Sequence, residues 1–369
     1  MTSRGVVLAG ASGYGRTYLR ELADLEARGL ARLVGVCDVL PRDRLALVGD
    51  RPVDADLDRL LRDTRPDIGI VSTPIHTHVQ MGRQVLDAGA HLLLEKPPAP
   101  TFDGWRELRA QDLARTAQVG FQSLGSGAFT RLRSLLRDGE LGEVRGIGGW
   151  GAWSRTDAYY RRAPWAGRRT LDGQPVVDGT LTNPFAHAVA TALALVDSTG
   201  EDDVATIELE MLRSRAIEAD DTSCLRLRTT SGITVLVAAT LCAATETEPV
   251  LVVHGSRARA ELHYTQDVLA LDGEACRYER TTPLQNLLAH LDDSRRPLQS
   301  GLDAGGAFMR VVEAVRLAPD PVPIGPQWLR RSGAGEDARV DVSGVEQALR
   351  DAAEHLQTFS ELGVPWAAR

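Results

Sequence analysis

The sequence predicts an α/β protein with a doubly wound parallel sheet in its first third and a second domain built on a large sheet. In the first third, short apolar strands alternate with amphipathic helices, which is typical of a parallel sheet covered by helices on both faces. In the second half, strand-like stretches follow one another directly. A chain of 369 residues also exceeds one ordinary core, so we expect two domains.

The expected strands of the parallel sheet are short and apolar, and they cover residues 6–9, 33–37, 67–72, 91–94 and 119–122. A helix with Tyr18 and Leu22 on its apolar side follows the first strand, and another over 77–88 ends at Gly89. Ligands of such sheets bind beyond the carboxyl ends of the strands. The residues expected at that edge are Gly10, Asp38, Pro74, Lys96 and Gln122.

A glycine-rich turn separates the first strand from its helix, and it consists of Gly10, Ala11, Ser12, Gly13, Tyr14 and Gly15. Gly10 and Gly15 match the first and third glycines of the dinucleotide-binding fingerprint, while Ser12 takes the place of the second. Backbone N–H groups and the positive end of a helix at such a turn bind a pyrophosphate. The alternative is an ordinary tight turn without a ligand.

Asp38 lies at the end of the second expected strand, 23 residues after Gly15. At this spacing a carboxylate accepts hydrogen bonds from the adenosine ribose, which favours NAD as the cofactor. NADP remains possible, because Arg42 or Arg44 is placed to meet a 2′-phosphate. The alternative is a strand-end carboxylate with no ligand.

Lys96 is the only lysine among 42 lysine and arginine residues. Arginine keeps its proton at any ordinary pH, whereas a desolvated lysine can give its proton up or point a single N–H at a substrate. Two explanations stay open from this residue alone. Lys96 has a function at the sheet edge, or an arginine-rich genome happened to spare one codon.

Residues 67–78 read DIGIVSTPIHTH, and the pattern continues through LDAGAH at 86–91 to EKP at 95–97. This combination resembles the Gfo/Idh/MocA oxidoreductases, the glucose–fructose oxidoreductase and inositol dehydrogenase family. The resemblance covers residues 5 to about 122 well and continues more loosely to about 318. It implies a Rossmann-type first domain and a second α+β domain with a large, mostly antiparallel open sheet. The outer face of that sheet often mediates oligomerisation, and substrate lies between the domains.

The resemblance also implies roles for residues that match the motif positions. The residues expected to line the cofactor groove are Ser72, Thr73, Pro74 and His78. Glu95 and Lys96 would flank the nicotinamide, and Gln122 would lie near its amide. For His78 the alternative is that it caps or supports the helix that begins there.

A long irregular stretch over residues 153–179 follows the first strand of the second domain. A loop of this length is usually functional or disordered, and its aromatic residues argue against disorder. The side chains expected to line a pocket for a polyhydroxylated ligand are those of Tyr160, Arg162 and Trp165. The alternative is that the aromatic rings pack only to hold the loop in place.

Asn183 and His187 lie at the start of an apolar helix over residues 189–196. The family usually has Asp-x-x-x-His here, with both polar groups at the substrate, so Asn183 departs from the pattern. Asparagine can orient a hydroxyl but cannot accept a proton, so acid–base work would fall on His187 and Lys96. Asn183 is also a good helix cap, with Pro184 at the first helical position, and this alternative stays open.

The domain boundaries are expected near residues 122 and 329. Residues 1–122 would form the dinucleotide-binding domain, and residues 123–329 the substrate and oligomerisation domain. Strands of the second domain are expected over 144–150, 205–212, 223–228, 233–241, 250–254, 258–263 and 268–271. Helices expected over 284–293 and 304–317 would cover one face of this sheet or pack back towards the first domain. Residues 330–369 would form a linker over 330–339 and a C-terminal helix over 342–362. Trp366 is expected to be buried if this end docks on the body.

Composition and charge exclude several classes of function. The net charge of −8 argues against nucleic acid or an anionic membrane surface as a partner. No apolar run reaches the length of a membrane span and no export leader is recognisable, so we expect a cytoplasmic protein. The four cysteines are far apart and form no metal-type pair, so no metal site is expected.

These features predict an NAD(P)-dependent oxidoreductase that acts on a secondary hydroxyl of a sugar or cyclitol-like small molecule. The hydroxyl would bond to Lys96 and His187, and one of them would take its proton as hydride leaves. The resemblance adds a homo-oligomer, either a dimer or a tetramer. Two alternatives stay open: an enzyme that holds NAD tightly and eliminates or hydrolyses without net redox change, and a non-catalytic dinucleotide-binding regulatory protein.

Overall fold

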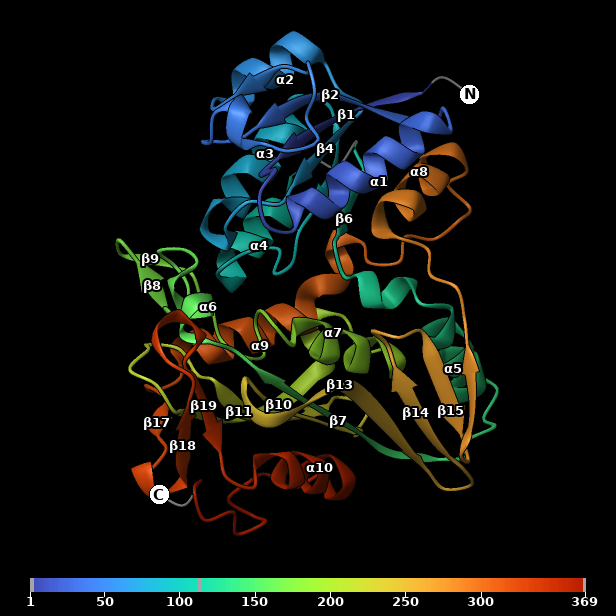
Figure 1. The fold of residues 1–369 in the computed structure, drawn as a ribbon. Coiled ribbons are helices and arrows are strands. Elements are labelled where there is room, and N and C mark those ends of the chain that lie inside the picture. Colours follow the sequence, from blue (N-terminus) through green and yellow to red (C-terminus); the bar gives the residue numbers. More distant parts are fainter. Residues whose placement is uncertain (1–2, 112–114, 368–369) are drawn as a thin grey trace. The chain divides into compact units, whose positions relative to one another are not determined.

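The computed structural model describes residues 3–111 and 115–367. They form two compact units, shown in Figure 1. The first unit comprises the chain up to Phe121 together with Thr282–Asp303, and the second comprises Gln122–Thr281 together with the chain from Ala304 onward. None of the helices in the described ranges is long and apolar enough to span a membrane.

The first unit contains a six-stranded parallel sheet with the order β3-β2-β1-β4-β5-β6. Its strands are β1 (Arg4–Ala9), β2 (Ala31–Cys37), β3 (Val53–Asp54), β4 (Ile68–Val71), β5 (His91–Leu94) and β6 (Ala117–Val119). This is the order of the doubly wound Rossmann sheet, with its switch point between β1 and β4. The predicted fold class of the first domain is confirmed.

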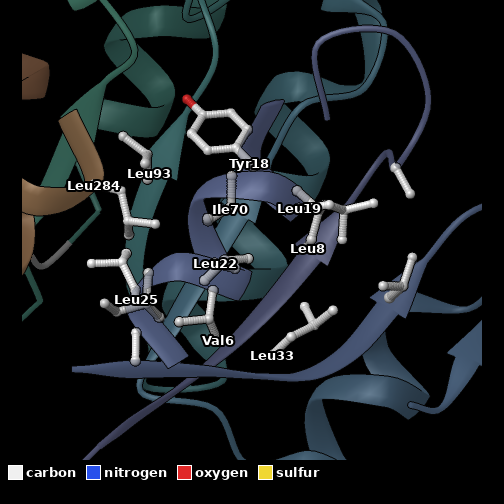
Figure 2. Close-up of a cluster of buried hydrophobic side chains, with 14 of the residues drawn as sticks. Val6, Leu8, Tyr18, Leu19, Leu22, Leu25, Leu33, Ile70, Leu93 and Leu284 are labelled. Atoms are coloured by element: carbon white, nitrogen blue, oxygen red, sulfur yellow. The ribbon is translucent and has the colours of Figure 1, made fainter. Parts of the chain in front are cut away.

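The helices of the first unit are α1 (Gly15–Ala27), α2 (Leu57–Thr64), α3 (His78–Asp87), α4 (Phe102–Arg109) and α8 (Pro283–Asp292), with short turns of 3-10 helix at η1 (Arg42–Arg44) and η2 (Ile75–Thr77). The apolar side of α1 buries Tyr18, Leu22 and Leu25 against the sheet (Figure 2). Burial of such side chains contributes about 1.5–3 kcal/mol each to folding.

Helix α8 belongs to the first unit, outside the boundaries predicted for that domain. The sequence had left open whether this helix covers the second sheet or packs back towards the first domain. Its leucines, including Leu284, pack in the same buried cluster as Leu25 and Leu93 (Figure 2). The buried amide of Gln118 on β6 also donates to the carbonyl of Pro283, at 2.7 Å. The local pattern predicted the helix correctly, but only long-range packing decides which unit it covers.

The second unit contains a nine-stranded sheet with the order β16-β15-β14-β13-β7-β12-β11-β10-β17. Its strands are β7 (Val144–Ser154), β10 (Val204–Arg213), β11 (Thr222–Thr229), β12 (Thr234–Thr240), β13 (Cys242–Gly255), β14 (Arg259–His263), β15 (Val268–Leu271), β16 (Glu274–Arg277) and β17 (Val322–Pro323). Neighbours pair antiparallel except for β7 with β12 and β10 with β17. The expected large, mostly antiparallel sheet is confirmed.

Helices cover both faces of this sheet, as Figure 1 shows, with α7 and α9 on one face and α10 on the other. The helices of the second unit are α5 (Gly127–Arg137), α6 (Asp157–Arg161), α7 (Ala186–Leu195), α9 (Gly306–Leu317) and α10 (Val345–His355). Short turns of 3-10 helix lie at η3 (Gln122–Gly125), η4 (Glu201–Asp203), η5 (Leu302–Gly305, at the boundary of the two units), η6 (Pro326–Trp328) and η7 (Gly335–Asp337).

The C-terminal segment is an integral layer of the second unit. Residues 330–339, which the sequence predicted as a linker, lie largely in a hairpin of β18 (Leu329–Ser332) and β19 (Arg339–Val342). A second hairpin joins β8 (Thr170–Leu171) to β9 (Gln174–Pro175). Helix α10 approaches β7 so closely that a side chain at Gly148 would collide with the backbone of Ala353. Trp366 is buried against Phe359, as predicted.

Candidate functional site

The glycine turn after β1 has the close backbone approach that a dinucleotide-binding turn requires. Gly10 has a φ of +82° and its N–H donates to the carbonyl of Cys37, at 2.8 Å. A Cβ added at Gly10 would lie 2.5 Å from the carbonyl oxygen of Ser72, and one added at Gly15 would collide with the carbonyl oxygen of Gly10. Both positions therefore exclude side chains, and the turn over residues 10–14 leads from the end of β1 into α1.

The rest of the turn leaves its solvent side open. Gly13 has a φ of +54°, and a Cβ added there would meet no atom within 4 Å. Tyr14 is exposed and its ring packs edge-on against Tyr18 at 5.5 Å, while the carbonyl of Ser12 accepts from Gly15 N–H. Helix α1 starts with neither a side-chain cap nor an acidic residue in its first turn. This arrangement fits a bound pyrophosphate, because an anion can accept from the N–H groups of the helix end.

Asp38 lies directly after β2 and contacts the glycine turn. Its Oδ2 accepts a hydrogen bond from the N–H of Ala11 at 2.8 Å, and its Oδ1 accepts one from Leu40 at 2.9 Å. Each carboxylate oxygen has a further lone pair with which it can accept from a ribose hydroxyl. The guanidinium of Arg42, one of two cations considered for a 2′-phosphate, donates instead to the carbonyl of Arg51.

The segment after β4 brings Ser72, Thr73 and Pro74 to the same sheet edge, as predicted from their position in the chain. Ser72 N–H donates to the carbonyl of Ala9, at 2.8 Å, and the hydroxyl of Thr73 lies 2.6 Å from that of Thr77. Ser72 and Thr73 are half-buried and Pro74 is exposed. Ser72 therefore lies beside the end of β1, next to the glycine turn, where a cofactor contact is feasible.

His78 is the first residue of α3, and its side chain is fully buried. Its Nε2 lies 2.8 Å from the carbonyl oxygen of Thr73 and its Nδ1 lies 2.7 Å from that of Pro97. Burial lowers the pKa of His78 to about 4, even though the two carbonyls favour the protonated ring. The ring therefore bridges two loops inside the first unit, so the expectation that it lines the cofactor groove is replaced by the alternative of structural support.

Glu95 and Lys96 follow β5, and their side chains have different surroundings. The Glu95 carboxyl is buried, accepts from the hydroxyl of Tyr18 at 2.6 Å and accepts from the Lys96 N–H at 3.2 Å. Burial raises the pKa of this carboxyl, although the bond from Tyr18 and the charge of Lys96 oppose the shift. Lys96 itself is half-buried, and the Lys96–Pro97 peptide bond is cis. Glu95 thus supports the Lys96 backbone from inside the unit. The expected place of Glu95 and Lys96 beside the nicotinamide stays a prediction.

Gln122 is the first residue of the second unit and lies in η3, not in the expected strand, because β6 already ends at Val119. Its backbone carbonyl accepts from the guanidinium of Arg280, at 2.5 Å. Among the described residues, no hydrogen-bond partner meets the buried Oε1 of Gln122. A contact of this side chain with the cofactor amide stays a prediction.

His187 is the second residue of α7 and is half-buried. Its Nδ1 lies 3.4 Å from the hydroxyl of Ser123, which in turn accepts a hydrogen bond from Thr191 at 2.8 Å. Ser123 and Thr191 are both buried. Because the Ser123 hydroxyl accepts from Thr191, its own proton can be donated to His187 Nδ1. An accepting Nδ1 favours the His187 tautomer that carries its proton on Nε2.

Asn183 does not cap α7, contrary to the alternative that the sequence left open. The helix begins at Ala186, the preceding Phe185 makes no side-chain cap, and the Asn183 amide donates to Asp178 Oδ1 at 2.6 Å. Asp178 is buried, and its Oδ2 accepts from the N–H of Gly167 at 2.7 Å. The preceding turn is fixed by Thr182, whose hydroxyl donates to the carbonyl of Val177 at 2.5 Å.

The candidate substrate residues of the long loop are engaged inside the second unit. Arg162 donates to the carbonyl of Tyr159 at 2.6 Å and lies 3.4 Å from Asp178, with its guanidinium 3.6 Å from the centre of the Tyr159 ring and 4.6 Å from that of Trp165. The hydroxyl of Tyr160 is buried, and burial together with Asp221 raises its pKa well above the ordinary value. Arg162 thus has partners within the unit, whereas no hydrogen-bond partner among the described residues meets the Tyr160 hydroxyl. A ligand contact of Tyr160, Arg162 or Trp165 stays a prediction.

Sequence reasoning missed Asp178, Ser123 and Thr191. Asp178 follows two valines in the run Val176-Val177-Asp178-Gly179, and a carboxylate inside an apolar run was the one available signal. Ser123 and Thr191 gave no signal, because hydroxyl residues are common and these two lie far apart in the chain. Within the described residues, no group of three or more histidine, cysteine or acidic side chains could hold a metal ion.

Two sequence families match this chain. The family described as an oxidoreductase family with an NAD-binding Rossmann fold matches residues 4–123, and the GFO/IDH/MocA C-terminal domain matches residues 129–261. The chain belongs to the Gfo/Idh/MocA oxidoreductase family. The resemblance seen in the sequence is thereby confirmed, and the first unit contains the family's NAD-binding Rossmann domain.

Curated relatives include D-glucoside 3-dehydrogenase from Escherichia coli, which is 29% identical over 140 residues, or 34% of this chain and 40% of the relative. Inositol 2-dehydrogenase from Salmonella agona is 24% identical over 143 residues, or 37% of this chain and 42% of the relative. The chain thus spans less than half the length of these curated relatives.

Solved structures share the fold over nearly their whole length. The WlbA dehydrogenase from Bordetella pertussis, in complex with NADH and UDP-GlcNAcA, aligns with a TM-score of 0.71 and 19% identity, covering 85% of this chain and 95% of that chain. UDP-N-acetylglucosamine 3-dehydrogenase from Acidithiobacillus ferrooxidans aligns with a TM-score of 0.68 and 18% identity, covering 86% of this chain and 98% of that chain. At these identities the likeness establishes the fold.

Proposed function

We propose that this protein is an NAD-dependent dehydrogenase that moves hydride between the nicotinamide and a secondary hydroxyl of a sugar or cyclitol. The observation that carries the proposal is the set of residues at one edge of the first sheet. There the glycine turn follows β1, Asp38 follows β2 and Lys96 follows β5. Membership of an oxidoreductase family supports the redox chemistry, and the glucoside and inositol dehydrogenases support a hydroxyl as the reacting group.

NAD is the proposed cofactor rather than NADP. The Asp38 carboxylate lies against the glycine turn, where its negative charge would repel a 2′-phosphate. Arg42 is engaged with the backbone carbonyl of Arg51, which makes it less available to a phosphate. We therefore expect NADH to bind more tightly than NADPH.

When bound, the nicotinamide accepts the hydride in the oxidation direction. The chain's own residues handle the proton. Because Thr191 and Ser123 favour a proton on His187 Nε2, a neutral His187 would donate a hydrogen bond to the substrate oxygen. Lys96 is then the proposed proton acceptor, since a lysine amine can take a proton and arginine cannot.

The test combines cofactor binding with turnover. Calorimetry should show NADH binding, and absorbance of reduced nicotinamide should change with a member of a panel of sugars and cyclitols. Lys96→Arg keeps the positive charge but removes the proton acceptor, so kcat should fall about 100-fold or more while NADH affinity is unchanged. His187→Ala should also lower kcat without changing NADH affinity.

Different outcomes point to different functions. A chain that binds neither NADH nor NADPH contradicts the proposal. Cleavage of a glycoside with a bound cofactor that shows no bulk redox change would indicate the eliminating or hydrolysing alternative. Cofactor binding that survives in Lys96→Arg, with no turnover in either protein, would indicate a regulatory protein.

A further inference from the structure

The first unit contains a buried phenol–carboxylate pair in contact with Lys96. Tyr18 lies on α1 with its ring in the apolar cluster, and its hydroxyl points out of that cluster (Figure 2). The hydroxyl donates to Glu95 Oε1 at 2.6 Å, across 77 positions of the chain. The other oxygen of the same carboxylate, Oε2, accepts from the backbone N–H of Lys96 at 3.2 Å. Tyr18 and Lys96 are therefore joined through one carboxylate.

Burial fixes both members of the pair in these roles. Tyr18 is 3% exposed and Glu95 is 7% exposed. Burial raises the pKa of the Tyr18 phenol well above its ordinary value, so the hydroxyl keeps its proton and donates. Among the described residues, no other hydrogen-bond donor meets Glu95 Oε1. Without the phenol, only the bond to Lys96 would hold the carboxylate, which could then rotate away from that N–H.

The backbone of Gly120 encloses the pair on another side. Its N–H donates to the carbonyl of Leu94 at 2.7 Å, so the chain after β6 runs close to the end of β5. A Cβ added at Gly120 would lie 2.6 Å from Glu95 Oε1 and 3.2 Å from the Tyr18 hydroxyl. The pair therefore fills the space that a side chain at 120 would need, and an alanine there would displace the carboxylate.

We propose that Tyr18 is a positioning residue for Lys96 and acts through Glu95. This inference rests on the proposed function, in which Lys96 takes the substrate proton. The Lys96 side chain leaves the backbone at the residue whose N–H the carboxylate holds. Fixing that N–H at the end of β5 limits the directions in which the amine can point. A displacement of about 1 Å at a reacting group can cost about 100-fold in rate.

The link gives the Tyr18 hydroxyl a function on an otherwise apolar side of α1. Leu22 and Leu25 on the same side bury only carbon, whereas a hydroxyl is costly to bury without an acceptor. Helix α1 begins at Gly15, where the glycine turn ends. One helix therefore carries the proposed pyrophosphate turn at its N-terminus and, three residues later, the phenol that holds Glu95.

The single lysine of the chain allows Lys96 to be observed directly. Protein made with isotope-labelled lysine gives one backbone amide signal by NMR, and the hydrogen exchange of that amide reports how firmly its N–H is held. Tyr18→Phe keeps the ring and removes the hydroxyl. The Lys96 amide should then exchange about 10- to 100-fold faster, which is the range for losing a hydrogen bond to a charged group.

Further variants test whether Tyr18 acts through the carboxylate. In Gly120→Ala the hydroxyl stays but the new Cβ displaces Glu95, so the exchange should speed up as in Tyr18→Phe. In Glu95→Met the carboxylate is absent, so adding Tyr18→Phe should change the exchange by less than about 2-fold. Tyr264→Phe removes the phenol of another buried tyrosine and is the matched control, which should leave the exchange unchanged.

Turnover with the panel of sugars and cyclitols connects the contact to the reaction. For a substrate that is oxidised, Tyr18→Phe should lower kcat about 10-fold or more, whereas KM and the NADH affinity stay unchanged. Adding Tyr18→Phe to Glu95→Met should cause no further loss. The unfolding temperature of each variant is measured alongside, because a merely structural role would lower that temperature without a selective loss of kcat.

The inference is overturned if either the Lys96 amide exchange or the kcat of Tyr18→Phe equals that of the wild type. It is also overturned if the effects of Tyr18→Phe persist in full when residue 95 is methionine, or if Tyr264→Phe gives the same changes. A wild type that oxidises no member of the panel contradicts the proposed function. The amide exchange then still decides whether Tyr18 positions Lys96.

Discussion

The two units position their candidate site residues by different means. In the first unit, Gly10 and Asp38 each follow a parallel strand directly and Lys96 comes after Glu95 at the end of β5, so the backbone of the sheet brings them to one edge. In the second unit, Asn183 and His187 lie before and at the start of α7 and are oriented by buried side chains, Asp178 and Ser123. The first site depends on strand order, whereas the second depends on a polar network.

This difference explains why the sequence predicts the first site more completely than the second. The end of a buried strand can be located from an apolar run, and strand order in a doubly wound sheet follows general rules. A side-chain network joins residues such as Ser123 and Thr191 that lie 68 positions apart. No local pattern connects them, so the sequence indicated Asn183 and His187 but only the structure shows the network that orients them.

The largest effect should come from breaking the backbone approach in the first unit. In Gly15→Ala the new Cβ would collide with the Gly10 carbonyl oxygen, so the turn must open. We expect NADH affinity to fall about 100-fold or more, because helix α1 can no longer start at the pyrophosphate. Gly301→Ala, in the same unit but outside the turn, is the control, since a Cβ there meets only the Leu298 side chain, at an ordinary 3.7 Å. If calorimetry shows that both variants lose NADH affinity equally, the close approach of residue 15 to the Gly10 carbonyl is not required for NADH binding.

The next effect tests the second unit, where the C-terminal helix covers one face of the sheet. Leu349 on α10 is fully buried in a cluster that includes sheet residues such as Leu236. Leu349→Ala should lower the free energy of unfolding by about 2–5 kcal/mol, because it leaves a cavity in the core. Gln347→Ala, on the exposed side of the same helix, should change it by less than about 0.5 kcal/mol.

Denaturant unfolding of both variants checks this prediction, and NADH affinity serves as a second measurement. The affinity should stay unchanged because the glycine turn and Asp38, which are proposed to hold the dinucleotide, belong to the other unit. If Leu349→Ala leaves the free energy of unfolding unchanged, packing of α10 on the sheet contributes little to the stability of the second unit.

The smallest effect concerns pH and the buried His78 of the first unit. An unfolded histidine has a pKa near 6.5, whereas burial lowers the pKa of His78 to about 4. Between pH 6.5 and pH 4, His78 is therefore protonated in the unfolded chain but neutral in the folded chain. The free energy of unfolding consequently falls as the pH drops through this range. For this one residue we expect a loss of about 2 kcal/mol between pH 7 and pH 5.

Comparing the wild type with His78→Gln isolates this contribution. Glutamine can still bond to a neighbouring carbonyl but does not titrate, so its stability should depend less on pH over the same range. Urea unfolding at both pH values measures the difference. Identical pH dependence in the two proteins would show that His78 is not buried in its neutral form.

By itself the sequence determined the fold class, the family, the glycine turn and the strand-end residues Asp38 and Lys96. These features depend on local apolar runs and on short motifs, both of which are written in consecutive residues. The sequence also indicated α8, the C-terminal helix and the burial of Trp366, but not where the first two pack.

Only the tertiary structure decided that α8 covers the first unit, that residues 330–339 contribute to a hairpin, and that His78 and Glu95 turn inward. It also decided that Asn183 bonds to Asp178 instead of capping a helix. The physical reason is common to these cases. A buried polar or apolar side chain takes the partner that satisfies it at the lowest free energy, and that partner is chosen in space rather than along the chain.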